Sequence, residues 1–166
     1  MKVNSIKRQP LGQTMVEMAF ALPIFLLLVM GIFEFGRLVF MNNAVYSASR
    51  EGARYAAATD TTTSGTPRYI DCAAIRNATK KAGLLANLTD ADITIMYDSG
   101  PSSLAGSKGS CPNPNPSLKL GDRIMVTVRA TFHPSVSFGV FHDLTLTSTT
   151  SRTIIKDLDV NVDGTF

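Results

Sequence analysis

The side chains able to carry out acid–base, nucleophilic or metal chemistry are few and scattered. The chain has 166 residues, with two cysteines and two histidines. His133 and His142 are nine residues apart, and neither has a second His or Cys at a spacing typical of a zinc site. The sequence contains no GxSxG, HExxH, phosphate-binding loop or dinucleotide fingerprint. We therefore predict a protein that is not an enzyme, with no catalytic residue, no metal site and no cofactor.

Cys72 and Cys111 are the two residues for which a covalent bond is expected. Both follow a long apolar segment, so beyond a membrane they would meet oxidising conditions. A bridge between them would close a loop of about 40 residues, which stabilises a fold by roughly 4 kcal/mol in the chain-entropy model. We predict this disulfide, and two free thiols are the alternative.

One acid, Glu17, stands inside the apolar segment, where a charge is costly. A cut between Gly12 and Gln13 would give Gln13 a positively charged amine. Residues 13 and 17 are i and i+4 in a helix, so this amine can face the carboxylate, as can the amine of a neighbouring subunit. The alternative is that Glu17 lies at the level of the lipid headgroups and Gly12 is a loop glycine.

The segment around Glu17 predicts a transmembrane helix. Residues 18–33 carry no charge, and apolar flanks bring the run to the length of about 20 residues that a span requires. A cleaved secretory signal is the alternative, but it should end at a small-x-small site soon after the run. The residues after the run instead remain helix-forming, which favours a retained helix.

The charge distribution predicts the orientation of this helix. The formal net charge is +3, and the basic residues Lys2, Lys7 and Arg8 of the leader account for it. Lys and Arg beside a span tend to stay in the cytoplasm. We expect a single-pass protein of the bacterial cytoplasmic (inner) membrane, with a cytoplasmic N-terminus and a periplasmic C-terminal domain. No basic stripe marks the rest of the chain, so nucleic acid is not an expected partner.

The helix is expected to continue beyond the lipid. Its apolar periodicity extends to residue 58, so residues 13–58 would form a helix of roughly 69 Å, against a hydrocarbon layer of about 30 Å. Residues 1–12 then form a basic leader, and residues 59–166 form an exported domain. Pro23 removes one helical hydrogen bond and is a candidate kink.

Two patterns on this helix have open interpretations. Glu34 and Arg37 are i, i+3 neighbours and are expected to pair, either for assembly or simply where the helix leaves the lipid. A stripe of small residues follows at every fourth position. It allows either a second backbone or the protein's own domain to approach closely. The stripe consists of Ala44, Ala48, Gly52 and Ala56.

The sequence of the expected exported domain predicts an α+β fold. Asp71 is placed to cap a short helix over residues 72–85. Strict alternation over residues 123–132 gives the best strand, and residues 92–97 and 144–156 complete about three antiparallel strands. Residues 98–117 are rich in Pro, Gly, Ser and Asn and are expected to form a long exposed loop. Helices on one sheet face would suit this order.

The N-terminal residues resemble two related families. A basic leader, Gly12, a Glu five residues into the mature chain and an apolar helix together resemble the type IV prepilin signature. A longer stretch resembles the TadE-like family, minor pilin-like proteins of tight-adherence (Flp) pilus systems. Met18 departs from the pattern, which usually has an aromatic residue after the Glu. The matching pieces are residues 12–13, 16–17, 21–23, 31–37 and 50–57.

This resemblance implies a structural subunit in pilus assembly, contributing to adherence or secretion. Its expected partners are other pilin-like subunits, the pilus assembly machinery, membrane lipid and a prepilin peptidase that cuts between Gly12 and Gln13. Two other functions stay open from the residues alone. One is a membrane-tethered module that binds through its 98–117 loop outside any filament, and the other is an exported enzyme with an unrecognised site.

Overall fold

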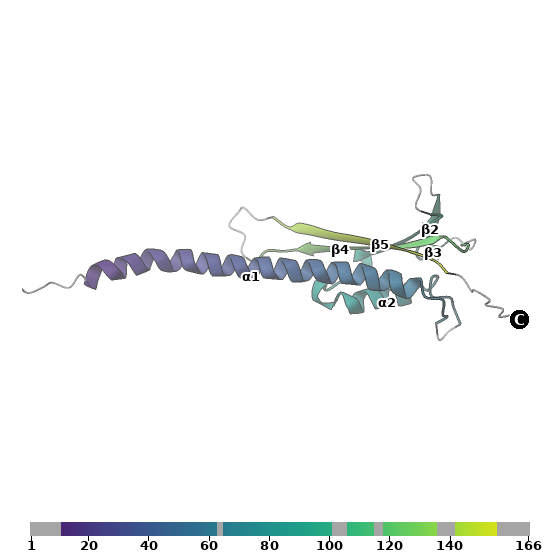
Figure 1. Ribbon diagram of the computed structural model, residues 1–166, viewed down its shortest axis with the longest axis horizontal. Coiled ribbons are helices and arrows are strands. Elements are labelled where there is room, and N and C mark those ends of the chain that lie inside the picture. Colours follow the sequence, from purple (N-terminus) through teal and green to yellow (C-terminus); the bar gives the residue numbers. More distant parts are fainter. Residues whose placement is uncertain (1–10, 63–64, 101–105, 115–117, 136–141, 156–166) are drawn as a thin grey trace, which may run out of the picture. The chain divides into compact units, whose positions relative to one another are not determined.

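The computed structural model describes residues 11–62, 65–100, 106–114, 118–135 and 142–155 (Figure 1). Most of the predicted leader, residues 1–12, lies outside this part of the chain. Contacts divide the chain into a unit of residues 1–38 and a unit of residues 39–166. The two units are described separately below.

The first unit consists of the N-terminal part of helix α1, Leu11–Ala56, which continues into the second unit. The prediction of a helix over residues 13–58 is therefore confirmed, with both ends two residues earlier. Leu, Met, Ala and Phe dominate the sequence, and the first three of these favour helix. Pro23 lies inside the helix, where its missing N–H removes one backbone hydrogen bond.

The second unit contains the short helix α2, Cys72–Ala82. Asp71 caps it as predicted, because its Oδ1 accepts a hydrogen bond of 2.9 Å from the backbone N–H of Ala74. Gly83 ends the helix and donates to the carbonyls of Thr79 and Lys80. Two 3₁₀ turns follow, η1 over Leu84–Ala86 and η2 over Asp90–Asp92. The predicted helix over 72–85 thus ends earlier, because the chain turns at Gly83.

The second unit also holds an antiparallel sheet with the strand order β3-β2-β1-β4-β5. The predicted α+β class is confirmed, and the three predicted strands correspond to β1, β4 and β5. The bounds are Ile93–Asp98 for β1, Ser107–Ser110 for β2, Asn113–Pro114 for β3, Arg123–Phe132 for β4 and Leu144–Thr153 for β5.

The strands β2 and β3 correct the prediction of one long loop over residues 98–117. β2 pairs with β1, and Ser110 lies opposite Met96. Neither short strand has an apolar alternation, so no local pattern announces it. This segment is held instead by the pairing of β2 with the edge of β1 that faces away from β4, and by the disulfide bond at Cys111. Residues 101–105 and 115–117 of the predicted loop lie outside the described residues.

Alternation along β4 places the core on one face of the sheet. Every second residue from Ile124 to Phe132 is buried, which is the pattern of a strand with one covered face. From β1, Ile93, Ile95 and Tyr97 join the same core. Residues 39–56 of α1 and α2 lie on this face of the sheet (Figure 1).

Close contacts fix how the two helices pack within this unit. A Cβ built at Gly52 of α1 would collide with Thr79 Oγ1 of α2 and approach Val126 Cγ1 of β4 at 3.2 Å. A Cβ built at Gly83 would lie 2.9 Å from Ala48 Cβ. Thr79 thus lies beside Gly52 and Gly83 beside Ala48, so α2 runs antiparallel to this part of α1.

A buried group of hydroxyls joins α1 to the edge strand β5. The Ser49 side chain is fully buried and donates to, or accepts from, Ser148 Oγ at 2.9 Å and Thr150 Oγ1 at 3.0 Å. Its Oγ also lies 3.0 Å from the carbonyl oxygen of Tyr46. These contacts satisfy polar atoms that burial would otherwise penalise.

Candidate membrane and assembly site

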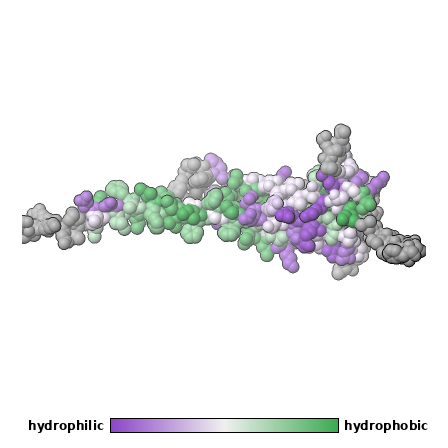
Figure 2. All heavy atoms as spheres, viewed as in Figure 1, coloured by the Kyte–Doolittle hydropathy of each residue, from purple (hydrophilic) through white to green (hydrophobic). Residues whose placement is uncertain are grey.

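The N-terminal part of α1 presents an apolar surface to its surroundings. The helix is long and apolar enough to cross a membrane, and no part of its most apolar stretch is buried within the protein. Large side chains such as Phe20 and Phe33 are 72% and 73% exposed. Figure 2 shows apolar side chains gathered along this part of α1. A water-soluble protein rarely exposes so large an apolar surface, so this helix fits a lipid environment.

The predicted processing and pairing residues lie together at the start of this helix. Gly12 is part of the first turn of α1, not of a loop, and a Cβ there would meet no atom within 4 Å. Gln13 and Glu17 are both exposed. Within the described residues, Glu17 forms no ion pair with another side chain. In the unprocessed chain Gln13 has no free amine, so its pairing with Glu17 stays a prediction.

Two local ion pairs lie on α1. Arg37 Nη1 lies 3.0 Å from Glu34 Oε1 and 3.1 Å from Glu34 Oε2. Farther along, Arg54 binds Glu51 through two hydrogen bonds of 2.6 and 2.8 Å, which lower the pKa of the Glu51 carboxyl. Exposed pairs of this kind contribute little to stability in water. In a membrane, neutralising Glu34 within its own helix reduces the cost of its charge.

The stripe of small residues on α1 serves the protein's own domain. Ala44, Ala48, Gly52 and Ala56 are all buried, and Gly52 packs directly against Thr79 and Val126. Of the two interpretations, packing against the protein's own domain is confirmed, and this stripe is not an open surface for a second helix.

The predicted disulfide is present. Cys72, at the start of α2, is bonded to Cys111, and their Cα atoms are 5.7 Å apart. Tyr97 of β1 is buried beside it and donates a hydrogen bond of 2.6 Å to the carbonyl oxygen of Tyr69. Burial raises the pKa of Tyr97. The bridge therefore joins the start of α2 to the segment that follows β2, and both lie beside β1.

An ion pair that the sequence did not indicate joins β1 to β4. Arg123 donates from Nε and Nη2 to the two carboxylate oxygens of Asp98, each at 2.8 Å. Arg123 also binds the carbonyl oxygen of Gly100. The bonds from Arg123 hold the pKa of Asp98 below its usual range, against the effect of burial. Asp98 is the last residue of β1, and no spacing rule connects it with residue 123.

A second buried acid supports the turn before β4. Asp122 Oδ2 accepts from the backbone N–H of Lys119 at 2.6 Å and from Lys108 Nζ at 2.9 Å. Although burial opposes the change, these bonds lower the pKa of Asp122. Gly121 has a φ of +95°, which suits glycine in this turn. The turn at Leu120 and Gly121 leads the chain into β4.

The two histidines are not brought together as a metal site. His133 Nδ1 lies 2.8 Å from Asp143 Oδ1, and both side chains are exposed. Over the described ranges, no group of three or more His, Cys, Asp or Glu side chains could hold a metal ion.

The fold and these residues define a class of protein with one membrane-length apolar helix joined to a disulfide-bonded α+β unit. The family model of the TadE-like protein matches residues 12–54, which confirms the predicted resemblance. The match covers α1 from its first turn almost to its end. No curated protein and no solved structure matches the chain.

Proposed function

We propose that the protein is a minor pilin-like (pseudopilin) structural subunit that acts in the assembly of a tight-adherence (Flp) pilus. The observation that carries this proposal is the TadE-like match over residues 12–54, which covers the exposed apolar part of α1 and continues into the part of this helix that packs within the second unit. A family match on this helix points to a role that the helix performs. That role is anchoring in the membrane and association with other pilin-like subunits.

In the proposed arrangement, α1 spans the cytoplasmic membrane and the unit of residues 39–166 lies on the periplasmic side. The disulfide between Cys72 and Cys111 supports this orientation, since disulfides persist in oxidising compartments. The partners are other pilin-like subunits, the assembly machinery and a prepilin peptidase that cuts after Gly12. The contribution to the cell is adherence or secretion through the pilus.

Glu17 supplies the most direct test. Its exposed carboxylate in an apolar helix would pair with an N-terminal amine, either its own at Gln13 or a neighbour's. Loss of such a pair costs about 1–2 kcal/mol in a membrane, which corresponds to a factor of about 5–30 in association. Glu17→Ala should lower surface piliation by about this factor, and Glu17→Asp should retain most of it.

Piliation is counted on cells that express each variant at equal membrane levels. Mass spectrometry of the purified wild-type protein should show a chain that starts at Gln13. Normal piliation with Glu17→Ala would remove the carboxylate from the proposal. An intact leader would contradict processing, and normal piliation in a strain that lacks the whole gene would contradict the pilus function and favour a tethered binding module.

A further inference from the structure

Exposed apolar side chains gather at one end of the unit formed by residues 39–166. Phe40 of α1 is 66% exposed, and Leu84 and Leu85 of η1 are 77% and 75% exposed. Leu144 at the start of β5 is 46% exposed. Adjacent leucines this exposed in a folded unit are unusual, because each leaves an apolar side chain in water.

The packing of the elements shows that these residues share one end. Because α2 runs antiparallel to α1, with Thr79 beside Gly52 and Gly83 beside Ala48, the chain that leaves α2 continues toward Phe40. Leu84 directly follows Gly83. Ala48 and Phe40 are eight residues apart in the helix, which is a rise of about 12 Å.

The sheet also extends to the end of the unit at which Phe40 and Leu84 lie. Val126 of β4 lies beside Gly52, and Ser49 binds Ser148, which is the partner of Val128. β4 therefore also runs antiparallel to this part of α1. Its last residue, Phe132, lies opposite Leu144, which places Leu144 toward Phe40 as well.

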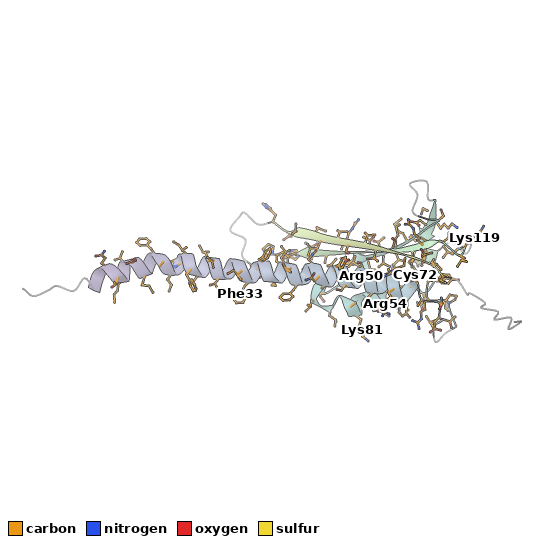
Figure 3. The ribbon with its side chains drawn as sticks, in the orientation of Figure 1. Phe33, Arg50, Arg54, Cys72, Lys81 and Lys119 are labelled. Atoms are coloured by element: carbon orange, nitrogen blue, oxygen red, sulfur yellow. A yellow bond between two sulfur atoms is a disulfide. The ribbon has the colours of Figure 1, made fainter. Side chains whose placement is uncertain are left out.

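The charges near this end are compatible with a lipid surface. The Asp90 carboxylate binds Lys80 at 2.8 Å, and Asp92 accepts hydrogen bonds from Thr89. Lys81 is exposed and, in the described part of the chain, has no acidic partner. In Figure 3, Lys81 lies nearer to this end of the unit than Lys119 does. An exposed lysine beside two exposed leucines matches the pattern of phosphate and acyl groups at a bilayer surface.

We propose that this end of the unit is a docking surface for the bilayer. We call it the lipid-facing end and define it by Phe40, Leu84, Leu85 and Leu144. Leu84 and Leu85 insert among the lipid headgroups, and Lys81 faces the lipid phosphates. Phe40 belongs to α1, the helix that also carries the candidate membrane span. The inference rests on the proposed membrane anchor.

Docking would give the unit a fixed orientation on the membrane before it joins other subunits. A span alone leaves the protein free to tilt and rotate in the bilayer, whereas a second contact with the lipid restricts that freedom. Assembly into a filament would then have to release Leu84 and Leu85 from the lipid.

The absence of tryptophan from the natural chain allows a direct experiment. Leu85→Trp places a single tryptophan at the lipid-facing end. Leu120→Trp is the matched control, because Leu120 is 62% exposed and precedes the opposite end of β4. Each full-length variant is reconstituted into vesicles of phosphatidylethanolamine and phosphatidylglycerol, with and without lipids brominated on their acyl chains.

We expect Trp emission in the Leu85 variant to be blue-shifted and to lose intensity with brominated lipid, and emission in the Leu120 variant to remain that of a water-exposed indole. Equal behaviour of the two variants, quenched or not, would overturn the lipid-facing end while leaving the anchor intact. Flotation of the vesicles reports on the anchor itself. Protein that does not float with the lipid would contradict the membrane anchor, and the docking surface with it.

Discussion

At the scale of single residues, Gly52 shows how closely the helices of the second unit approach. Any side chain at this position would displace Thr79 Oγ1 and press on Val126 Cγ1. We expect Gly52→Ala to lower the free energy of unfolding by about 1–3 kcal/mol, the usual cost of overpacking a core. Urea unfolding of the detergent-solubilised full chain, followed by tyrosine fluorescence, measures this change.

Gly36→Ala is the matched control for that measurement. Gly36 lies in the same helix, and a Cβ there would meet no atom within 4 Å. Alanine favours helix over glycine by up to about 1 kcal/mol, so this variant should unfold at the same urea concentration or a higher one. Equal stabilities for Gly52→Ala and Gly36→Ala would contradict the packing of α1 against α2 and β4.

The Asp98–Arg123 pair makes stability depend on pH. The bonds from Arg123 lower the pKa of Asp98 in the folded state, relative to an unfolded value of about 3.9. The pair therefore stabilises fully above the unfolded pKa, and its contribution is lost as the pH falls through the folded pKa. The native protein should lose stability below about pH 4 through this group.

Asp98→Asn isolates this contribution. The variant should be less stable at pH 7 by about 1–3 kcal/mol, because it removes a charge-assisted hydrogen bond from a buried site. It should also lose less stability than the native chain between pH 7 and pH 3. Asp60→Asn is the control, since Asp60 is 70% exposed in its pair with Arg68 and exposed pairs contribute about 0–1 kcal/mol. A pH profile of Asp98→Asn that parallels the native one would contradict this assignment.

Residue-level prediction from the sequence succeeded where partners are close along the chain. The pair Glu34–Arg37 and the cap at Asp71 both follow from helical spacing. It failed for the pairing of Asp98 with Arg123 and for the hydroxyls around Ser49, because those partners meet only once the sheet has formed. The disulfide was predicted because both cysteines follow the apolar segment, on the side where oxidising conditions are expected.

At the scale of elements, the bridge between Cys72 and Cys111 fixes a segment that has little apolar surface of its own. The cysteines are separated by 39 residues, so the chain-entropy model gives a stabilisation of roughly 4 kcal/mol. Replacing both with Ser should lower the free energy of unfolding by about 2–4 kcal/mol. The exchange rate of backbone amide hydrogens should rise first in β2 and in the residues that follow it.

Amide hydrogen exchange with mass spectrometry checks this prediction peptide by peptide. The strands β4 and β5 provide an internal control, because their pairing is continuous from Arg123 to Phe132 and does not depend on the bridge. Uniform loss of protection over the whole unit would contradict the local role assigned to the disulfide.

The elements themselves were predictable to different degrees. The strand β4 follows from its alternation, and α1 follows from its length and apolar content. β2 and β3 were missed because their glycine, serine and proline residues carry no periodic signal. Their extended form depends on pairing, of β2 with β1 and of β3 with β2. The small residues of α1 permitted two interpretations, since packing against a neighbour and against the chain's own sheet require the same pattern.

At the scale of the whole molecule, each of the two units contributes a different property. Residues 12–54 carry the family resemblance and the apolar surface, whereas the remaining part of the chain carries the disulfide and the sheet. Function is proposed from the helix because lipid and neighbouring subunits are what such a surface can bind. The unit of residues 39–166 contributes the structure that would be displayed outside the membrane.

The central claim is that the N-terminal part of α1 remains in the membrane while the second unit folds on the periplasmic side. Alkaline extraction of membranes, combined with protease digestion of intact spheroplasts, tests it most directly. We expect the full chain to stay with the membrane pellet and its C-terminal unit to be cleaved by protease added outside. Recovery of an uncleaved chain with reduced cysteines in the cytosolic fraction would contradict the account.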